Sequence, residues 1–389
     1  MRADRSAVLE GLAPALRDAG YTTEALQRAV RAASPDDVGV LNHGPALERV
    51  RGDRSTAATL LRLFFLEAPE RYRDVAKALS RARCDQLLRA GLLRRRGDRV
   101  EARLRIDAVG TQYFIADRRF GSLDRSAMGL PGRDPVYPPS SDSLLLRDAV
   151  VAAAGARALD LCTGSGIQAM QQAPHAAAVV AVDLSPRAAA VAAHNARLNA
   201  VHHVDVRVGD LYAPVRGERF DLIIANPPFV SSPYRNAPGY HAGGPRGDRV
   251  LRRIVAGLAR HLQPGGRAFA VSHLALPRRD DMEGVARAWF RNFDGRALVL
   301  VLETGTPVDL AAAQALFALE RGVAAYAAEV RRWVAYLRAH RIETVAAILV
   351  VAERRGRRGV EVVEAQARVL PIPLTPPPAE RIRTWLGRA

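Results

Sequence analysis

The sequence predicts an α/β fold in which a largely parallel sheet is covered by helices on both faces. From about residue 135, short apolar runs rich in β-branched residues alternate with segments of helical periodicity, which is typical of parallel sheets. We expect seven strands: Arg157 to Cys162, Ala178 to Asp183, Val204 to Val208, Phe220 to Ala225, Arg267 to Ser272, Leu298 to Glu303 and Val345 to Glu353. Helices are expected between them, for example Pro186 to Asn199 and Ala328 to Ala339.

The region before this sheet predicts a helical unit that ends in a hairpin. Amphipathic helices are expected over Ser55 to Phe65, Tyr72 to Leu79 and Cys84 to Ala90. A basic hairpin follows, with Leu92 to Arg96 and Arg99 to Ile106 as its strands around a Gly-Asp turn. Helices followed by such a hairpin are similar to a winged helix. A unit of this kind reads nucleic acid, holds a substrate or contacts a protein, and the pattern leaves these alternatives open.

Proline and glycine mark the domain boundaries. The segment Gly129 to Ser140 is dense in both residues and separates an N-terminal domain, residues 1–134, from a second domain, residues 135–370. The last segment, residues 371–389, is a tail, and Leu370 to Pro378 is too rich in proline for regular structure.

Composition and charge restrict the function classes. The formal net charge is +17, but the excess is about +7 over residues 1–135, about +5 over 136–275 and about +5 over 276–389, so no domain carries it alone. Clustered arginine favours an acidic partner such as RNA, whereas an even spread does not require one. The two cysteines, Cys84 and Cys162, predict neither a disulfide framework nor a metal centre. No stretch approaches the roughly 20 apolar residues of a membrane span, so we expect a cytoplasmic protein.

A glycine turn follows the first strand and predicts a cofactor site. The sequence Asp160-Leu161-Cys162-Thr163-Gly164-Ser165-Gly166 lies where a strand becomes a helix, and glycines there let the backbone approach a ligand. Gly164, Gly166 and Ala169 also fit a dinucleotide fingerprint, with Asp183 at the distance from which a carboxylate binds a ribose. A nicotinamide enzyme is therefore one alternative.

Two carboxylates favour a methyl donor over a dinucleotide. Asp160 lies inside the strand, where it can hold the amino group of a methionine moiety. Asp210 follows the third strand and can accept a hydrogen bond from the adenine amine, while Leu184 and Leu211 cover the two ring faces. The expected cofactor-binding residues are Asp160, Cys162, Thr163, Gly164, Gly166, Asp183, Leu184, Asp210, Leu211 and Asn226.

The motif Asn226-Pro227-Pro228-Phe229 indicates the chemistry. It ends the strand Phe220 to Ala225, at the edge where open α/β sheets carry their active sites. The Asn226 side-chain oxygen and the Pro227 carbonyl offer two acceptors to one NH₂ group, and Phe229 can stack on a planar amide or base. Asn226, Pro227 and Phe229 are therefore the expected catalytic residues, for transfer of a methyl group to a planar amino nitrogen.

These motifs resemble those of class I S-adenosyl-L-methionine-dependent methyltransferases, and among them the HemK/PrmC group of glutamine methyltransferases. Three segments carry the resemblance: Tyr137 to Ser143 before the cofactor turn, Asn226 to Phe229, and the glycine-rich stretch Tyr240 to Asp248. It covers about residues 135–303 and implies a Rossmann-like seven-stranded domain that uses S-adenosyl-L-methionine. It also implies that acceptor-side contacts come from Tyr137, Pro138, Ser143, Pro228 and Tyr240.

The acceptor itself stays open. Phe229 stands where the group usually has Tyr, and similar enzymes with Phe methylate a base of ribosomal RNA. We therefore expect an N-methyltransferase that acts on a macromolecule, either on a protein glutamine or on an RNA base. The alternatives are a small-molecule N-methyltransferase of secondary metabolism and a nucleic-acid binder with a vestigial cofactor fold.

Overall fold

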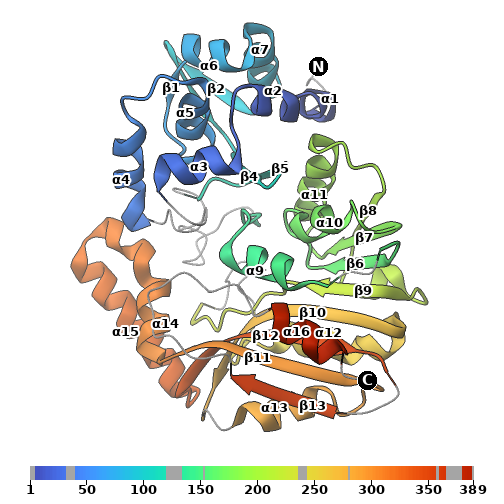
Figure 1. The fold of residues 1–389 in the computed structure, drawn as a ribbon. Helices are drawn as coiled ribbons and strands as arrows, with labels where there is room; N and C mark the ends of the chain where they lie inside the picture. The colour runs from blue at the N-terminus through green and yellow to red at the C-terminus, as the bar shows by residue number, and fades with distance from the viewer. Residues whose placement is uncertain are drawn as a thin grey trace.

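The computed structural model of the 389-residue chain describes residues 5–31, 40–119, 134–151, 154–234, 243–278, 281–355, 359–364 and 379–387. Two bodies of structure are visible in Figure 1, a helical unit built from the first residues and a large sheet with its helices. Among the described residues, no helix is long and apolar enough to cross a membrane.

The N-terminal unit consists of helices around one apolar core. Its elements are α1 (Arg5–Glu10), α2 (Leu12–Asp18), α3 (Thr23–Val30), α4 (Val40–Val50), α5 (Thr56–Leu60), the π-helix η2 (Leu61–Phe65), β1 (Glu70–Arg71), α6 (Tyr72–Leu79), α7 (Arg81–Arg89), β2 (Leu93–Arg96) and β3 (Arg99–Ala102). The three short strands form an antiparallel sheet in the order β1, β3, β2. The three helices predicted between residues 55 and 90 are thus confirmed.

The basic hairpin is shorter than predicted. Its second strand was expected to reach Ile106, but β3 ends at Ala102 and a new strand, β4 (Arg105–Val109), pairs with β5 (Gln112–Ala116) in a separate sheet. The reason is the burial of Arg105, which is 1% exposed, forms an ion pair of 2.8 Å with Asp107 and donates to the Phe65 carbonyl. The alternation of charged and apolar residues predicted that the charged side chains of the second strand face solvent. Arg105 and Asp107 instead form an ion pair inside the core.

The β4–β5 hairpin lies between the two bodies. On β5, Tyr113 and Ile115 pack into the N-terminal core, while Phe114 points the other way into the core of the large sheet. Two asparagines pair with the edge of β5. Asn195 lies in α11 (Pro186–Leu198), and Asn199 directly follows that helix. Asn195 bonds both the N–H and the carbonyl of Ile115, and Asn199 does the same for Tyr113. Asn195 also donates to the carbonyl of Ser165, so the hairpin is tied to the predicted cofactor turn.

The large sheet has eight strands. They are β6 (Arg157–Leu161), β7 (Ala178–Asp183), β8 (Val204–Val208), β9 (Phe220–Ala225), β10 (Leu262–Leu276), β11 (Arg296–Gly305), β12 (Thr344–Glu353) and β13 (Gly359–Glu364), in the spatial order β13-β11-β12-β10-β9-β6-β7-β8. All pairs are parallel except those of β12, which runs antiparallel to both β10 and β11. The mixed α/β class is confirmed, and each of the seven predicted strands is present.

The eighth strand, β13, corrects the predicted number. It pairs with β11 alone, at the edge of the sheet, and its sequence, Gly-Val-Glu-Val-Val-Glu, is only half apolar and lacks a regular alternation. A short edge strand needs only partial apolar character, because one edge and part of each face meet solvent. Its sequence therefore carried too weak a signal to be recognised.

Helices cover both faces of the sheet. One face packs against α9 (Ser141–Ala149), α10 (Ile167–Gln172), α11 and α16 (Ala379–Gly387), whose buried residues join one core cluster. The other face packs against α12 (Arg249–His261) and α13 (Asp281–Trp289). The predicted Pro-rich segment Leu370 to Pro378 lies outside the described residues, but α16 follows it and buries Ile382, Trp385 and Leu386 against the sheet. Residues Ala379–Gly387 thus form a packed helix, which the sequence did not predict.

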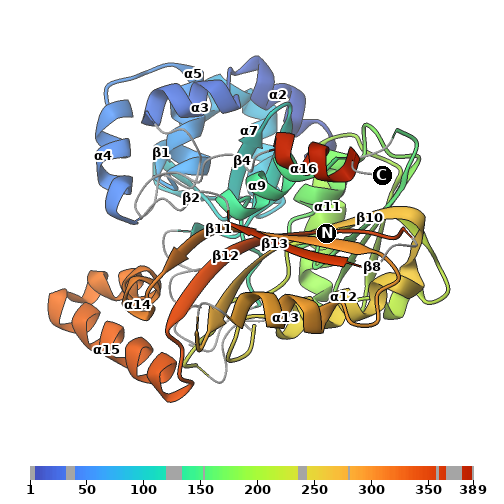
Figure 2. The same cartoon turned by 60° about the horizontal axis from the view of Figure 1, so that its bottom comes forward.

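Two helices project beyond the carboxyl end of the sheet. They are α14 (Pro307–Ala315) and α15 (Val323–Ala339), joined by the 3₁₀ turn η6 (Leu316–Arg321), and they follow β11. In Figure 2 the pair, drawn in orange, stands out past the ends of β11 and β12. The helix predicted over Ala328 to Ala339 is present as α15, which begins earlier, at Val323.

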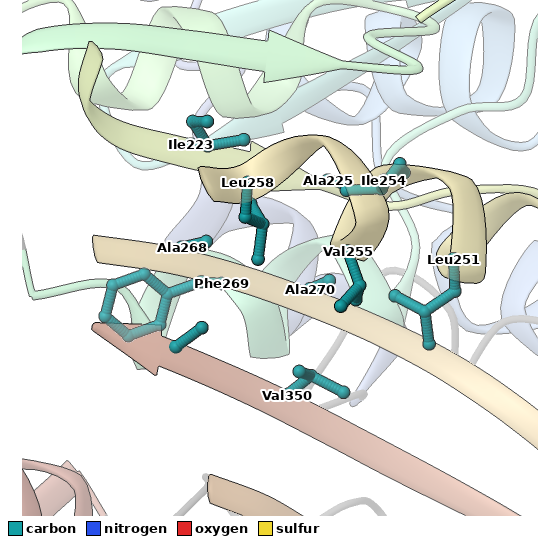
Figure 3. A pocket seen from close by; sticks show the side chains of 11 residues that line it. Ile223, Ala225, Leu251, Ile254, Val255, Leu258, Ala268, Phe269, Ala270 and Val350 are labelled. Carbon is teal, nitrogen blue, oxygen red and sulfur yellow. The ribbon is translucent and has the colours of Figure 1, made fainter. Parts of the chain in front are cut away.

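An apolar recess lies in the core, between α12 and the strands β9, β10 and β12 (Figure 3). Its lining includes Ile223, Leu251, Leu258, Phe269 and Val350, and every lining side chain is apolar. A recess without polar groups offers nothing to orient a cofactor or a planar amide. It is therefore a packing feature of the core and separate from the predicted site.

The pairing of β5 by Asn195 makes a prediction about stability. Asn195 is fully buried, so Asn195→Ala leaves the Ile115 amide and two carbonyls without partners and should lower the free energy of unfolding by roughly 2–4 kcal/mol. Urea unfolding monitored by circular dichroism measures the change. Asn199→Ala is the matched control: because Asn199 is only half-buried, water can replace its bonds, and the loss should be about 1 kcal/mol. Equal losses for the two variants would contradict this ranking.

Candidate active site

The site lies where the strand order reverses. From β6 the chain continues outward to β7 and β8, whereas β9 lies on the other side of β6 and leads to β10. Such a switch point leaves a crevice at the carboxyl ends of the two central strands. Leu161 of β6 pairs with Ala225 of β9, so the glycine turn and Asn226 leave the sheet side by side. The two predicted motifs, which are far apart in the sequence, are thus neighbours in space.

Asp160 is a buried carboxylate just below the crevice. It is 1% exposed, and its Oδ2 accepts hydrogen bonds from the Thr163 hydroxyl at 2.6 Å and the Ala169 N–H at 3.0 Å. Its Oδ1 is buried and has no partner in the described part of the chain. Burial raises the pKa of Asp160 to about 7, in spite of these two hydrogen bonds, which lower it. An unpartnered buried acceptor is costly, which makes Oδ1 a place for a cationic donor.

The turn after β6 is held in an unusual backbone conformation. Cys162 has a φ of +59°, which is uncommon for a residue with a side chain, and Gly166 has a φ of +84°. A Cβ on Gly166 would lie 3.1 Å from the Cβ of Ala192 in α11, so the absence of a side chain permits close packing of turn and helix. Burial also raises the pKa of the Cys162 thiol, which therefore stays protonated at neutral pH. Both cysteines are free, and Cys84 is buried in the N-terminal core.

Asp183 ends β7 and faces the same turn. Its Oδ2 accepts the N–H of Gly164 at 2.9 Å and its Oδ1 accepts the N–H of Ser185 at 2.9 Å. Burial raises the pKa of Asp183, while the backbone hydrogen bonds lower it. Each oxygen keeps further acceptor capacity for a ribose hydroxyl. The neighbouring Leu184 is 69% exposed, which is the expected state of a side chain that covers a ligand ring.

The region after β8 contains a contact that the sequence did not predict. Asp210 was expected to accept a hydrogen bond from an adenine amine, but its Oδ2 is bound at 2.7 Å by Arg253 of α12. Oδ1 of Asp210, and the remaining acceptor capacity of its Oδ2, can still accept a hydrogen bond from a ligand. Leu211 is buried, with 8% exposure and a φ of +50°, and its role as a cover of the adenine ring stays a prediction. Arg253 was not predicted because it lies in a helix 43 residues further along.

Asn226 follows β9 at the mouth of the crevice. Among the described residues its side chain has no hydrogen-bond partner, and it is only half-buried. Pro227 is buried and Pro228 is half-buried, and neither has an N–H that could compete for the acceptors. The Asn226 amide and the Pro227 carbonyl are therefore available to a ligand.

Phe229 is stacked on a side chain that the sequence analysis did not identify. Its ring centroid lies 4.4 Å from that of His273 in β10, with 27° between the planes. The Nε2 of His273 lies 3.8 Å from Oδ1 of Asp142, at the start of α9. The segment Tyr137 to Ser143, which was expected on the acceptor side, is thus brought to the motif. No local pattern marks His273, since its role depends on the pairing of β10 with β9.

Other predicted acceptor-side residues are placed as follows. Tyr137 is 36% exposed, Pro138 is buried, and the carbonyl of the buried Ser143 accepts a hydrogen bond of 2.7 Å from Gln168 of α10. Tyr240 lies outside the described residues. The glycine-rich stretch that follows it packs directly on the motif, since a Cβ on Gly247 would lie 2.4 Å from the Phe229 carbonyl oxygen.

The projecting helices α14 and α15 also reach this region. Trp333 of α15 and Ala311 of α14 are buried against Val230, and Phe229 packs at the edge of the same cluster. Glu329 accepts hydrogen bonds from Trp333 and from the hydroxyl of Tyr234, which lies five residues after Phe229. The helix pair therefore supports the segment that follows the motif. Among the described residues, no group of three or more His, Cys, Asp or Glu side chains is arranged to hold a metal ion.

Comparison with known proteins gives two family matches. Residues 140–292 match the model of the "Methyltransferase small domain", and residues 18–103 match a domain of unknown function, DUF7059. The second match covers most of the N-terminal helical unit.

Several relatives are similar to part of this chain. A release factor glutamine methyltransferase of Xylella fastidiosa is 34% identical over 181 residues, which are 43% of this chain and 64% of that protein. A ribosomal protein uL3 glutamine methyltransferase of Bradyrhizobium diazoefficiens is 44% identical over 125 residues, which are 28% of this chain and 38% of that protein. The chain thus spans less than two thirds of the length of these relatives. A solved methyltransferase of Pyrococcus furiosus is 16% identical, covers 56% of this chain and 84% of that one, and superposes with a TM-score of 0.36.

The switch-point crevice, the glycine turn and these matches together define a methyltransferase domain. The match of residues 140–292 to the model of the methyltransferase small domain includes both motifs, Asp160 to Gly166 and Asn226 to Phe229. The cofactor of this domain is S-adenosyl-L-methionine. The site fits this cofactor, since the unpartnered Oδ1 of Asp160 is an acceptor of the kind that its amino group requires.

The raised pKa of Asp160 predicts how cofactor binding depends on pH. The carboxyl is largely protonated below about pH 7 and cannot then accept from an ammonium group, so affinity for S-adenosyl-L-methionine should rise as pH increases through 7. Asp160→Asn should abolish this rise and weaken binding at least about 10-fold at pH 8. Isothermal titration calorimetry at several pH values measures both effects. Asp205→Asn, at an exposed side chain on β8, is the control and should behave as the wild type.

The same shift has an opposite effect on the ligand-free protein. Between the unfolded-state pKa near 3.8 and the folded-state pKa of about 7, the folded state holds the Asp160 proton more tightly, so stability falls as pH rises through this window. Asp160→Asn should remove that component. A variant that loses cofactor binding and also unfolds at every pH would instead indicate a purely structural role for the carboxylate.

Proposed function

We propose that the protein is an S-adenosyl-L-methionine-dependent N-methyltransferase that methylates the side-chain amide of a glutamine in a protein of the translation apparatus. The observation that carries this proposal is the unpartnered Asn226 side chain next to the cofactor turn. The names of the relatives support the acceptor class, since they are glutamine methyltransferases of release factors and of ribosomal protein uL3. Action on such proteins implies a cytoplasmic enzyme.

The proposed mechanism depends on the alignment of the acceptor nitrogen. The bound cofactor supplies a methyl group on a positively charged sulfur. The Asn226 oxygen and the Pro227 carbonyl accept the two N–H groups of the glutamine amide, which directs the nitrogen lone pair toward the crevice. Phe229 stacks on the amide plane. The nitrogen becomes acidic once it carries the methyl group, so its proton leaves to water, and no strong protein base is required.

The proposed assignments follow the predicted sites. We assign cofactor binding to Asp160, Cys162, Thr163, Gly164, Gly166, Asp183, Leu184, Asp210, Leu211 and Asn226, with Arg253 as a competitor for Asp210. The acceptor contacts are assigned to Pro228 and to the Tyr137 to Ser143 segment with Tyr240. We also propose the domain limits 1–134 and 135–370, with 371–389 as a terminal segment, and a winged-helix-like arrangement of α5, α6, α7 and the β2–β3 hairpin.

Asn226→Ala tests the proposed acceptor site. The variant loses one of two acceptors for the amide, and turnover should fall about 10²–10³-fold. The assay is transfer of radiolabel from S-adenosyl-L-methionine to purified release factor or uL3 protein. Cofactor affinity, measured by calorimetry, should fall far less than turnover, because the other assigned cofactor contacts remain. Asn292→Ala, at an exposed position after α13, is the matched control. Loss of cofactor binding together with turnover would argue for a structural role of Asn226.

A second candidate acceptor is a nucleobase in RNA. Phe229 in place of Tyr favours it, and so do the exposed arginines of the β2–β3 hairpin and α7. Arg94 and Arg96 share one carboxylate, Glu101, which leaves this surface with excess positive charge.

Salt dependence tests contact with RNA. If the hairpin binds phosphates, affinity for a ribosomal RNA fragment falls steeply with salt, and the double variant Arg95→Ala with Arg96→Ala lowers the slope of log K against log salt by about 1–2 units. Fluorescence anisotropy gives the slope. Arg331→Ala with Arg338→Ala, at exposed positions of α15, is the control. A flat salt response of the wild type would remove the RNA candidate.

A further inference from the structure

We propose that His273 is a positioning residue of the acceptor site, which holds the ring of Phe229 in the plane on which the acceptor stacks, and that Asp142 orients His273. The proposal deepens the function proposed above and rests on it for the identity of the acceptor. His273 lies in none of the segments that carry the predicted site, whereas Asp142 lies in Tyr137 to Ser143, which was expected on the acceptor side.

The position of His273 follows from the register of the sheet. Ala270 of β10 pairs with Ala225, the last residue of β9, so β10 continues past the point where β9 ends and the motif begins. Three residues further, His273 lies beside the loop that carries Phe229. On alternate positions of β10, Phe269 and Val271 join the core on the α9 side, and His273 shares their side of the strand.

The stacking of the two rings is supported from the backbone. Gly247 has a φ of +78°, and a Cβ there would lie 2.4 Å from the Phe229 carbonyl oxygen and 2.5 Å from the His273 carbonyl oxygen. Gly243 is equally close, since its Cβ would lie 2.5 Å from the Phe229 carbonyl carbon. Two glycines therefore allow the loop, the strand and the glycine-rich stretch to pack at van der Waals distance. The Phe229 and His273 backbones are held at a fixed separation.

A third segment, the start of α9, reaches the imidazole on the same side of the sheet. Asp142 lies in the first turn of α9, and its Oδ1 is 3.8 Å from Nε2 of His273, with the two side chains 26% and 36% exposed. Phe229 itself stays half-buried. One face of the Phe229 ring is thus covered by His273, and the proposal places the planar acceptor on the opposite face. Without His273 the phenyl ring gains freedom to rotate, and loss of alignment at a reacting centre lowers the rate.

Four variants test the proposal in methyl transfer to purified release factor and uL3 protein. His273→Ala should lower kcat/KM for the acceptor about 10-fold or more and leave the affinity for S-adenosyl-L-methionine unchanged. His273→Phe keeps an aromatic ring in the same place and should restore most of the activity. Asp142→Asn should lower kcat/KM in the wild-type background but not in the His273→Phe background, because only an imidazole needs to be oriented. His340→Ala, at an exposed histidine packed against Tyr336 on α15, is the control and should be silent.

The opposite results would overturn the proposal. If His273→Phe is as inactive as His273→Ala, a ring nitrogen rather than the stacked ring is what matters. If His273→Ala is more active than the wild type, His273 occupies the place of the acceptor and does not support it. If all variants match the wild type, His273 has no positioning role.

A measurement without turnover separates this proposal from the proposed function. The protein, labelled with 4-fluorophenylalanine, contains ten such residues, and Phe229→Leu assigns the fluorine resonance of residue 229. His273→Ala should shift and broaden that resonance, whereas His273→Phe should keep it sharp. An unchanged resonance in His273→Ala would overturn the proposal, even if neither acceptor protein were methylated. Absence of methylation with the expected resonance changes would instead overturn only the proposed acceptor.

Discussion

The site depends on one buried carboxylate. Asp160 lies inside the central strand β6, and its Oδ2 holds both Thr163 and Ala169, so the turn that follows is shaped around it. The cost of this burial is visible in the raised pKa and in the unpartnered Oδ1. A carboxylate in such a position destabilises the free protein and is offset when a cation binds. The positive φ of Cys162 belongs to the same turn, and the two features together favour a ligand site there.

The same turn is linked to the N-terminal unit. Asn195 bonds the β5 backbone and the Ser165 carbonyl, and β5 buries alternate side chains in two different cores. The N-terminal unit is therefore packed against the cofactor turn through a shared strand edge. Further contact comes from the double hydrogen bond of Arg187 to Asp117, which follows β5. These links give the unit that matches DUF7059 a fixed relation to the methyltransferase domain.

The acceptor side is assembled from segments that are distant in sequence. Phe229 follows β9, His273 belongs to β10, Asp142 begins α9, and α15 supports the loop through Glu329 and Trp333. Sequence reasoning identified Phe229 because it lies in a compact motif. It missed His273 and Glu329, since a lone histidine in a strand and a glutamate in a helix carry no local signal. It also could not identify Arg253 as a partner of Asp210, because this ion pair with α12 is a tertiary contact.

The sequence by itself determined the α/β class, the seven central strands and the two motifs at the carboxyl ends of β6 and β9. Local patterns suffice for these, because apolar alternation, glycine turns and the Asn-Pro-Pro-Phe segment act within a few residues. The tertiary structure decided which side chains face those motifs. It also added the edge strand β13, ended the basic hairpin at Ala102 and packed the C-terminal helix α16. These features depend on strand register, on burial of paired charges and on contacts between distant segments, which no local pattern encodes.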